Sequence, residues 1–378
     1  MKSIIIYYGP KKGYEQIIPD SKKTLAEIVS AHDSKMNTHL LVVHQEGKQE
    51  IKDIEVEKLH IDNVVAYSES YACITEGAIQ SFLTILNDYN IDNLYLQNPP
   101  KQIVTQLEQT YPKIIKVKRY NYQRLTGRMF KRLANQFNTT IIGQEDVKEK
   151  LLVALYPLLN KNKNSKPIVI MFYGESGVGK TETAKLISNI IGQKLFRKQF
   201  SMFQNMEFSN YLFGGKHSQD SFAKDLLERE SNVILIDEFD KPAPVFHSAF
   251  YQLFDEGIYE DKNYKVEMKN SIIICTSNYR NENEIRSALG DPIYFRFDDI
   301  IFYNDLTLIS KQILIERIFE NRWKLLTEKE IKFLGNKEDL LDKYLSYGNQ
   351  LKNFRHIDNL IKQDLNLTLF KRIISDNS

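Results

Sequence analysis

The chain has 378 residues, of which 42% are hydrophobic and 26% are charged, and its formal net charge is +2. This length is enough for two or three domains, and the near-neutral charge excludes a polyelectrolyte that binds its partners by overall charge alone. Two cysteines in so long a chain exclude a disulfide framework and indicate a reducing compartment. The apolar run at the N-terminus is too short for a signal peptide, and no run reaches the roughly 18 apolar residues of a membrane span. We therefore expect a cytoplasmic protein with no membrane partner.

Residues 1–120 alternate predicted strands and predicted helices. The strands are Ile4–Tyr7, Leu40–Val43, Asn93–Leu96 and Ile114–Val117, and the helices are Thr24–Ala31, Glu76–Leu86 and Lys101–Thr110. This alternation predicts a small α/β domain with a mainly parallel sheet. The segment carries no glycine fingerprint for nucleotides and its histidines are dispersed in sequence, so we interpret it as a domain that recognises a partner or a signal.

Basic and aromatic residues are interleaved around a predicted linker helix, residues 121–140. No acidic residue occurs between Gln109 and Gln144. The basic residues are Lys113, Lys116, Lys118, Arg119, Arg124, Arg128, Lys131 and Arg132, and the aromatic residues are Tyr111, Tyr120, Tyr122, Phe130 and Phe137. In single-stranded nucleic-acid sites, cations pair with phosphates and rings stack on bases, so residues 113–132 are a candidate nucleic-acid interface. The alternative is a linker whose aromatic rings pack and whose charges face water.

A glycine-rich loop between a predicted strand and a predicted helix is the most specific motif of the chain. Residues 174–181 read G-x-x-x-x-G-K-T, after the apolar run Pro167–Tyr173 and before the amphipathic run Glu182–Ile191. The glycines let backbone N–H groups turn toward a polyphosphate, and the helix N-terminus adds a favourable dipole. We expect Lys180 to reach the β- and γ-phosphates of ATP and Thr181 to bind Mg²⁺. The expected nucleotide-binding residues here are Gly174, Glu175, Ser176, Gly177, Val178, Gly179, Lys180, Thr181 and Glu182.

Two further predicted strands run from apolar into polar residues. Asn232–Glu238 ends in two acids, and Ser271–Asn278 ends in an amide. The carboxyl ends of parallel strands meet at the edge of the sheet where ligands bind. We expect Asp237 to bind Mg²⁺, Glu238 to polarise the attacking water, and Asn278 to hold that water beside the γ-phosphate. Lys180, Glu238 and Asn278 are therefore predicted catalytic residues.

From about residue 141 to residue 301, the order of these motifs resembles the AAA+ ATPase module of the Clp protein-unfoldase family, especially the second module of its two-module members. Four further segments carry the resemblance: Ile141–Gln144 on the adenine side, Ala243–Gly257, Thr276–Asn278 and Asp291–Ile301. The resemblance implies a P-loop NTPase core with a parallel sheet over residues 141–303 and a helical lid over residues 304–378. It also implies ATP and Mg²⁺ as cofactors and a chaperone-type activity on proteins.

Further site residues are implied by the resemblance. Ile141 and Ile142 fall at the adenine side, and Lys352 or Arg355 falls where the family's lid carries a second nucleotide sensor. Arg296 is the candidate arginine finger, a cation that a neighbouring subunit brings to the γ-phosphate. Such a finger implies a head-to-tail contact, and hence a ring-like homo-oligomer that we expect to be a hexamer. The apolar stripe of the lid is expected to include Ile309, Ile313, Ile318 and Phe319.

One segment departs from the family's pattern. Clp unfoldases grip their substrate with an aromatic–glycine pore loop, but the matching region, Ser209–Ala223, is short and has Lys216 and His217 where the tip would lie. We expect Tyr211 and Phe213 to pack rather than to line a pore. The main hypothesis is therefore an ATPase that remodels a protein partner selected by the N-terminal domain. The alternatives are a nucleic-acid-responsive AAA+ switch or motor, and an ATP-gated oligomeric signalling scaffold.

Overall fold

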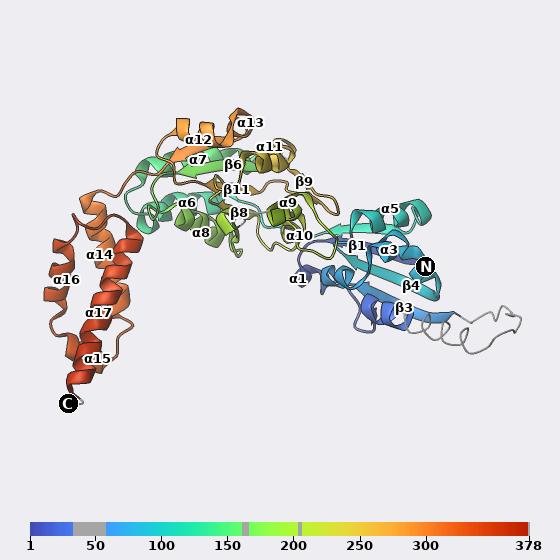
Figure 1. Ribbon diagram of the computed structural model, residues 1–378, viewed down its shortest axis with the longest axis horizontal. Helices are drawn as coiled ribbons and strands as arrows, with labels where there is room; N and C mark the ends of the chain where they lie inside the picture. Colours follow the sequence, from blue (N-terminus) through green and yellow to red (C-terminus); the bar gives the residue numbers. More distant parts are fainter. Residues whose placement is uncertain (33–57, 161–165, 203–205, 377–378) are drawn as a thin grey trace, which may run out of the picture. The chain divides into compact units, whose positions relative to one another are not determined.

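The computed structural model describes residues 1–32, 58–160, 166–202 and 206–376 (Figure 1). The chain divides into two compact units. The N-terminal unit comprises Met1–Gln123, Phe203–Asn232 and Ser248–Lys269, and the P-loop unit comprises Arg124–Met202, Val233–His247 and Asn270–Ser378. Two segments from within the predicted ATPase subdomain thus group with the predicted N-terminal domain. We call them the first inserted segment, residues 203–232, and the second inserted segment, residues 248–269.

A five-stranded sheet in the order β2-β3-β4-β1-β5 forms the core of the N-terminal unit. Its strands are β1 (Ser3–Tyr8), β2 (Lys23–Thr24), β3 (Leu59–Ala66), β4 (Tyr89–Gln97) and β5 (Ile115–Arg119). Every neighbouring pair is parallel, as the alternation of strands and helices predicts. Ile4, Ile6, Leu94 and Leu96 are fully buried, because helices cover the central strands of a parallel sheet on both faces.

The sequence pattern misses two strands of this sheet, the two-residue β2 and the longer β3. His60 and Asp62 interrupt the apolar pattern of β3, and both side chains are exposed where the strand begins. The predicted strand Leu40–Val43 lies outside the described residues.

Helices connect the strands of the N-terminal unit. They are α1 (Lys11–Tyr14), η1 (Ser68–Cys73), α3 (Glu76–Gln80), α4 (Phe82–Asn87) and α5 (Lys101–Thr110), and residues 25–32 are also helical. The single helix predicted over Glu76–Leu86 is therefore wrong, since the chain forms both α3 and α4 there. Ser81 leaves the helical conformation at φ −115° and ψ 34°, and its hydroxyl donates to the carbonyl of Gly77 over 2.8 Å.

The two inserted segments share an aromatic core. Their elements are α9 (Met206–Phe213), α10 (Phe222–Leu227), α11 (Tyr251–Glu256), β9 (Ile258–Glu260) and β10 (Lys265–Glu267), with η4 (Pro244–Phe250) leading into α11. The ring of Phe222 lies 5.6 Å from that of Phe250 and 5.0 Å from that of Tyr259, centroid to centroid. Strands β9 and β10 pair as an antiparallel hairpin. Packed aromatic rings thus join two segments that are separated in sequence.

The P-loop unit is built on a second five-stranded parallel sheet, in the order β12-β6-β11-β8-β7. Its strands are β6 (Ile168–Tyr173), β7 (Phe196–Gln199), β8 (Val233–Asp237), β11 (Ile272–Thr276) and β12 (Asp299–Phe302). Its helices are α6 (Gly127–Thr140), α7 (Glu145–Leu155), η2 (Tyr156–Leu159), α8 (Lys180–Ile191), η3 (Phe200–Met202), α12 (Glu282–Leu289) and α13 (Asp291–Tyr294). The continuous apolar runs of β6, β8 and β11 are buried throughout, which places their polar ends together at one edge.

Four helices at the C-terminal end form a bundle with its own apolar core (Figure 1). They are α14 (Leu308–Trp323), α15 (Glu328–Leu334), α16 (Lys337–Ser346) and α17 (Phe354–Asp376). Ile318 and Phe319 are buried as predicted, but Ile309 and Ile313 are exposed by 69% and 43%. The buried stripe of α14 runs through Leu314 and Ile315 instead. Among the described helices, none is both long enough and apolar enough to cross a bilayer.

Candidate nucleotide-binding site

The glycine-rich loop joins β6 to α8 in a conformation that requires glycine. Gly174, Gly177 and Gly179 have φ values of 129°, 81° and 115°, which side-chain-bearing residues rarely adopt. A Cβ atom at Gly174 would lie 2.4 Å from the carbonyl oxygen of Tyr303, and one at Gly179 would lie 3.2 Å from Cγ2 of Ile141. The loop is therefore a narrow backbone cradle of the kind that binds phosphates through N–H groups.

Lys180 is the buried cation of this loop. Its Nζ donates to the carbonyls of Gly174 and Glu175, over 2.5 Å and 2.8 Å, and to Oδ1 of Asn278 over 3.2 Å. Burial lowers the pKa of Lys180 to about 8, although the nearby carboxylate of Asp237 acts in the opposite direction. The structure thus brings together Lys180 and Asn278, which lie far apart in the sequence. The three oxygens that accept hydrogen bonds from this ammonium are uncharged. A bound phosphate would therefore supply a negatively charged partner for Lys180.

Asp237 ends β8 with its carboxylate almost buried. Its Oδ1 accepts a hydrogen bond from the hydroxyl of Thr276 over 2.5 Å, and its Oδ2 accepts from Nε and Nη2 of Arg197 over 3.1 Å and 2.5 Å. Thr181 lies in the first turn of α8. A carboxylate and a hydroxyl are the hard oxygen ligands that Mg²⁺ prefers, so this donor set fits that ion.

Glu238 follows Asp237 and leaves the strand in a strained conformation. Its φ is 56°, which is uncommon for a residue with a side chain. Its N–H donates to the hydroxyl of Thr276 over 3.0 Å, and its Oε2 accepts from Nε2 of Gln199 over 3.3 Å. The half-buried carboxylate is thus fixed at the same sheet edge as Asp237, where a general base for water would stand.

The adenine-side motif joins the loop to the chain that enters the lid. Nε2 of Gln144 donates to the carbonyls of Val178 and Asn304, over 3.3 Å and 2.7 Å, and its Oε1 accepts from the N–H of Asn304 over 3.1 Å. Ile141 is buried in the core of the P-loop unit, while Ile142 packs against the apolar core of the bundle. These two isoleucines therefore lie where the sheet-bearing part and the bundle meet.

Of the two lid candidates, the structure brings Arg355 to the loop. Its Nη1 donates to the hydroxyl of Ser176 over 3.2 Å, and the N–H of Phe354 donates to the carbonyl of Gly177 over 3.4 Å. Lys352 is exposed in the residues before α17. The beginning of α17 is therefore the part of the bundle that contacts the phosphate-binding loop.

Three arginines complete the surroundings of the site. Arg296 follows α13, and its Nη1 donates to the carbonyl of Pro292. Arg197 and Arg280 are not among the predicted site residues, yet Arg197 binds Asp237, and Nε of Arg280 donates to Oε1 of Glu175 over 2.8 Å. Only the pairing of β7 with β8 brings Arg197 to the acid, so no local sequence pattern identifies it.

The region that matches the pore loop of Clp unfoldases, in the first inserted segment, contacts residues 1–123 of the N-terminal unit. His217 is 5% exposed, and its Nε2 lies 2.8 Å from the carbonyl oxygen of Ile74. The predicted packing of Tyr211 is confirmed, because it is buried and its hydroxyl donates to Asp225 over 2.5 Å. The predicted packing of Phe213 is wrong, because this residue at the C-terminal end of α9 is 42% exposed.

The aromatic residues of the basic stretch pack against protein. Phe137 is buried in the core of the P-loop unit, and Phe130 lies edge-on to Tyr156 with 6.4 Å between ring centroids. Tyr120 and Tyr122 are 4.9 Å apart, and the guanidinium of Arg229 lies 4.0 Å from the centroid of the Tyr122 ring. These contacts favour the alternative of a packed linker over the predicted base-stacking interface in residues 113–132.

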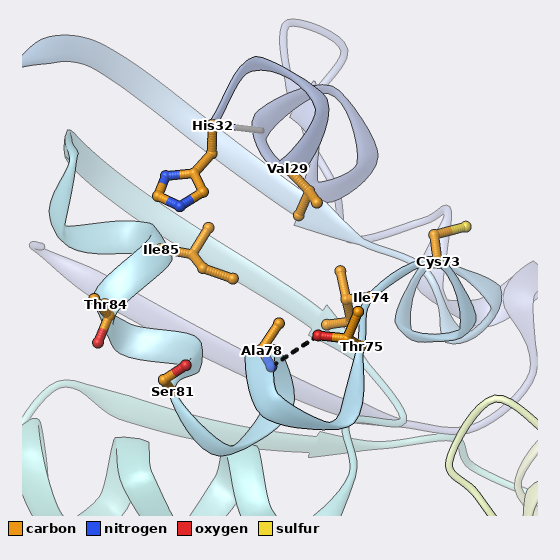
Figure 2. Close-up of a pocket in the computed structure, with 9 residues that line it drawn as sticks. All are labelled: Val29, His32, Cys73, Ile74, Thr75, Ala78, Ser81, Thr84 and Ile85. Carbon is orange, nitrogen blue, oxygen red and sulfur yellow. Dashed lines mark hydrogen bonds between the residues drawn. The ribbon is translucent and has the colours of Figure 1, made fainter. Parts of the chain in front are cut away.

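Two other features of the N-terminal unit carry titratable groups. A cavity of about 270 Å³ is lined by Val29, His32, Cys73, Ile74, Thr75, Ala78, Ser81, Thr84 and Ile85, and Figure 2 shows that the side chains of Cys73 and His32 do not point toward each other.

Elsewhere, ligand atoms of His60, Asp62 and Asp92 lie within 4.8 Å of one another, on β3 and β4. The ammonium of Lys2 lies 2.8 Å from Asp92, which already compensates part of this charge.

Comparison with known proteins agrees with this geometry. Residues 165–299 match the family described as AAA domain (Cdc48 subfamily). The chain is 27% identical to the chaperone protein ClpB of Wolinella succinogenes over 50% of its own length and 26% of that relative. It is 33% identical to the AAA+ ATPase ClpV1 of Pseudomonas aeruginosa, over 40% of the chain and 18% of the relative. It is 25% identical to the ATP-dependent Clp protease ATP-binding subunit ClpL of Staphylococcus aureus, over 84% of the chain and 47% of the relative.

The chain thus spans less than half the length of each of these relatives. The matched region nevertheless contains the phosphate-binding loop, the two acids that end β8, and Asn278 after β11. Residues 165–299 of the P-loop unit thus match an AAA domain, and this part of the chain is similar to AAA+ ATPases of the Clp type.

Proposed function

We propose that the chain binds Mg·ATP at the loop between β6 and α8 and hydrolyses it there. The observation that carries this proposal is the convergence of Lys180, Asn278, Asp237 and Glu238 at one edge of the sheet. ATP supplies the reacting phosphoryl group when it is bound. Lys180 balances the phosphate charge, Thr181 and Asp237 hold Mg²⁺, Asn278 orients the attacking water, and Glu238 takes its proton.

We further propose that this ATPase works in a head-to-tail ring and remodels a protein partner. The relatives named chaperone ClpB and Clp subunit ClpL support a protein as the substrate. His217 is buried against Ile74, so this residue of the region that matches a pore loop does not face a polypeptide substrate. The N-terminal unit is therefore the proposed site of partner selection. Packing of the aromatic rings in residues 113–132 gives no support to the nucleic-acid alternative.

Glu238→Gln tests the hydrolysis step. This variant should bind ATP as the natural chain does and hydrolyse it at least about a hundredfold more slowly, because the water loses its general base. Nucleotide binding by fluorescence and phosphate release measure the two properties separately. Glu149→Gln, the same change at an exposed position of α7 in the P-loop unit, is the matched control. Normal turnover by Glu238→Gln would contradict the assignment of the base.

The same variant tests the partner class. Glu238→Gln held in ATP should retain any partner that the ATP-bound ring engages, and affinity capture followed by mass spectrometry identifies it. Recovery of one or a few proteins, insensitive to nuclease and lost with Lys180→Ala, supports a protein remodeller. Recovery of nuclease-sensitive nucleic acid would contradict it.

A further inference from the structure

The side chain of Glu228, in the first inserted segment, occupies the carboxyl end of the N-terminal sheet. Its Oε1 accepts from Nδ2 of Asn98 over 2.7 Å and from Nε2 of Gln97 over 3.0 Å, and its Oε2 lies 3.3 Å from the N–H of Lys11. Gln97 is the last residue of β4 and Asn98 follows it, while Gly9 follows the last residue of β1. In parallel sheets this is the edge where ligands bind. The carboxylate of Glu228 therefore lies at the edge of the N-terminal sheet where parallel sheets commonly bind ligands.

The receiving side of this contact is buried and locally strained. Gln97 and Asn98 have no exposed surface, and Asn98 has a φ of 46°. The amide of Asn98 also accepts from the N–H of Gly9 over 2.9 Å and donates to its carbonyl over 3.0 Å. A buried amide that is held in a strained conformation by its own sheet is a rigid, preorganised receptor for the carboxylate.

The neighbouring residue strengthens the same junction. Arg229 is 4% exposed, its Nη1 donates to the carbonyl of Leu226 over 2.6 Å, and its guanidinium stacks over Tyr122 at 4.0 Å. Burial lowers the pKa of Arg229, and the ring of Tyr122 acts in the opposite direction. A buried cation on an aromatic face adds an attachment that does not depend on Glu228.

The second inserted segment is attached to the same sheet. Nζ of Lys101 donates to Oε1 of Glu260 over 2.7 Å and to the carbonyl of Asp261 over 2.6 Å, and the N–H of Lys101 donates to the carbonyl of Asn263 over 2.8 Å. At the end of β5, Nη2 of Arg119 donates to Glu267 over 3.2 Å. Both inserted segments are therefore attached to the N-terminal sheet by direct hydrogen bonds.

Each inserted segment leads directly into a strand that carries a site residue. The first segment continues into β8, which ends in Asp237 and precedes Glu238. The second segment continues through Asn270, which has a φ of 56°, into β11 and Asn278. In the described chain, the non-glycine residues with positive φ are Asn98, Glu238 and Asn270. Strained backbone therefore occurs at the residue that binds Glu228, at the proposed general base, and just before β11 begins.

We propose that Glu228 is a positioning residue for ATP hydrolysis, through which the state of the N-terminal sheet sets the placement of Glu238. This inference rests on the proposed hydrolysis of ATP at the loop. A partner that moves the carboxyl end of the N-terminal sheet displaces the attached segments, and the backbone carries that displacement into β8 and β11. The N-terminal unit thereby adjusts the turnover number and leaves the phosphate-binding loop unchanged.

Steady-state ATP hydrolysis by the full chain tests this inference, with rates expressed per nucleotide-binding site. Glu228→Ala removes the carboxylate, and Asn98→Gly removes the receiving amide while tolerating the positive φ. Both should lower kcat by about tenfold or more, because small displacements far from the reacting atoms have effects of this size. KM for ATP should stay unchanged, since the loop is untouched. Glu228→Gln should keep a near-natural kcat, because its amide oxygen still accepts from Asn98.

A matched control and a second measurement separate positioning from folding. Lys2→Ala removes an exposed ion pair of the same sheet and should leave kcat unchanged. Hydrogen exchange of backbone amides should rise in β8 and β11 of Glu228→Ala, but not in β6. If kcat and hydrogen exchange are unchanged in both Glu228→Ala and Asn98→Gly, the inference is wrong. It is also wrong if the decrease in kcat only follows the fraction of unfolded protein.

Two outcomes separate the positioning role of Glu228 from the proposed hydrolysis of ATP. If the natural chain binds ATP but does not hydrolyse it, the proposed function fails, and the exchange in β8 alone decides whether Glu228 controls that strand. If the natural chain hydrolyses ATP and the two variants match it in kcat, the function stands and the positioning role is wrong.

Discussion

At the scale of single residues, burial and charge decide what each site residue can do. Lys180 is held by carbonyl and amide oxygens, whereas the carboxylate of Asp237 is balanced by Arg197. The pKa of Lys180 is lowered to about 8 because desolvation outweighs the nearby acids. A buried ammonium of this kind responds strongly to a polyphosphate, since bound phosphates stabilise its charged form.

The lowered pKa of Lys180 predicts a pH-dependent affinity for ATP. Below about pH 8 the free protein carries the charged ammonium, so the affinity is at its full value. As the pH rises through about 8, the free protein loses this proton, and ATP must restore it on binding. The affinity should then fall, approaching about tenfold per pH unit. Titration with a fluorescent ATP analogue between neutral and alkaline pH measures this dependence.

Lys180→Arg is the control for that titration. Arginine stays protonated throughout the range, so the affinity of this variant should be weaker but insensitive to pH. A flat profile for the natural chain would show that the ammonium remains charged in the free protein, and the predicted dependence would be wrong.

At the scale of elements, the phosphate-binding loop is held between β6 and the residue that follows β12. Gly174 has a φ of 129°, and the carbonyl of Tyr303 leaves no room for a side chain there. The bundle contacts the same loop through Phe354 and Arg355 at the beginning of α17. The loop conformation therefore depends on strand order and lid packing as well as on its own glycines.

Gly174→Ala should damage the loop in a measurable way. The new Cβ meets the carbonyl of Tyr303, and the backbone must adopt a strained conformation that costs about 1–3 kcal/mol. Urea unfolding should show this loss, and nucleotide binding should be strongly weakened. Gly127→Ala, at the exposed first residue of α6 with nothing within 4 Å, is the matched control and should not destabilise the protein. Equal stability of the two variants would contradict the prediction.

At the scale of the whole molecule, the proposed ring requires a site that two subunits complete. Arg296 follows α13 and belongs to the same P-loop unit as Lys180. As an arginine finger it would act on the nucleotide of a neighbouring subunit, in a head-to-tail contact.

Subunit mixing tests that arrangement. Arg296→Ala and Lys180→Ala should each abolish most ATP hydrolysis on their own. Mixed rings place an intact loop beside an intact Arg296 at some interfaces, so mixing the two inactive variants should restore measurable turnover. A mixture of Lys180→Ala with Glu238→Gln is the control, because both changes act on the same loop side and should not complement. Failure of the first mixture to recover activity would show that Arg296 does not act between subunits.

Local sequence determined the parts of the protein that depend on neighbouring residues. The order of apolar strand, glycine loop and helix predicts β6, the loop and α8, because the glycines at 174, 177 and 179 and the apolar run each act within a few residues. The apolar runs that end in Asp237, Glu238 and Asn278 likewise predict a shared polar edge, because parallel strands align their carboxyl ends. The order of these motifs also carries the resemblance to the AAA+ module of the Clp family, which residues 165–299 match as an AAA domain.

Tertiary structure alone decided which distant residues meet. Arg197 reaches Asp237 only through the pairing of β7 with β8, and Arg355 reaches Ser176 only through the packing of the lid. Glu228 reads as an ordinary acid at the end of a short helix, yet it binds Asn98 in the N-terminal sheet. Contacts between residues far apart in sequence depend on the strand order and on the packing of whole elements, and no local pattern of hydrophobicity or charge records them.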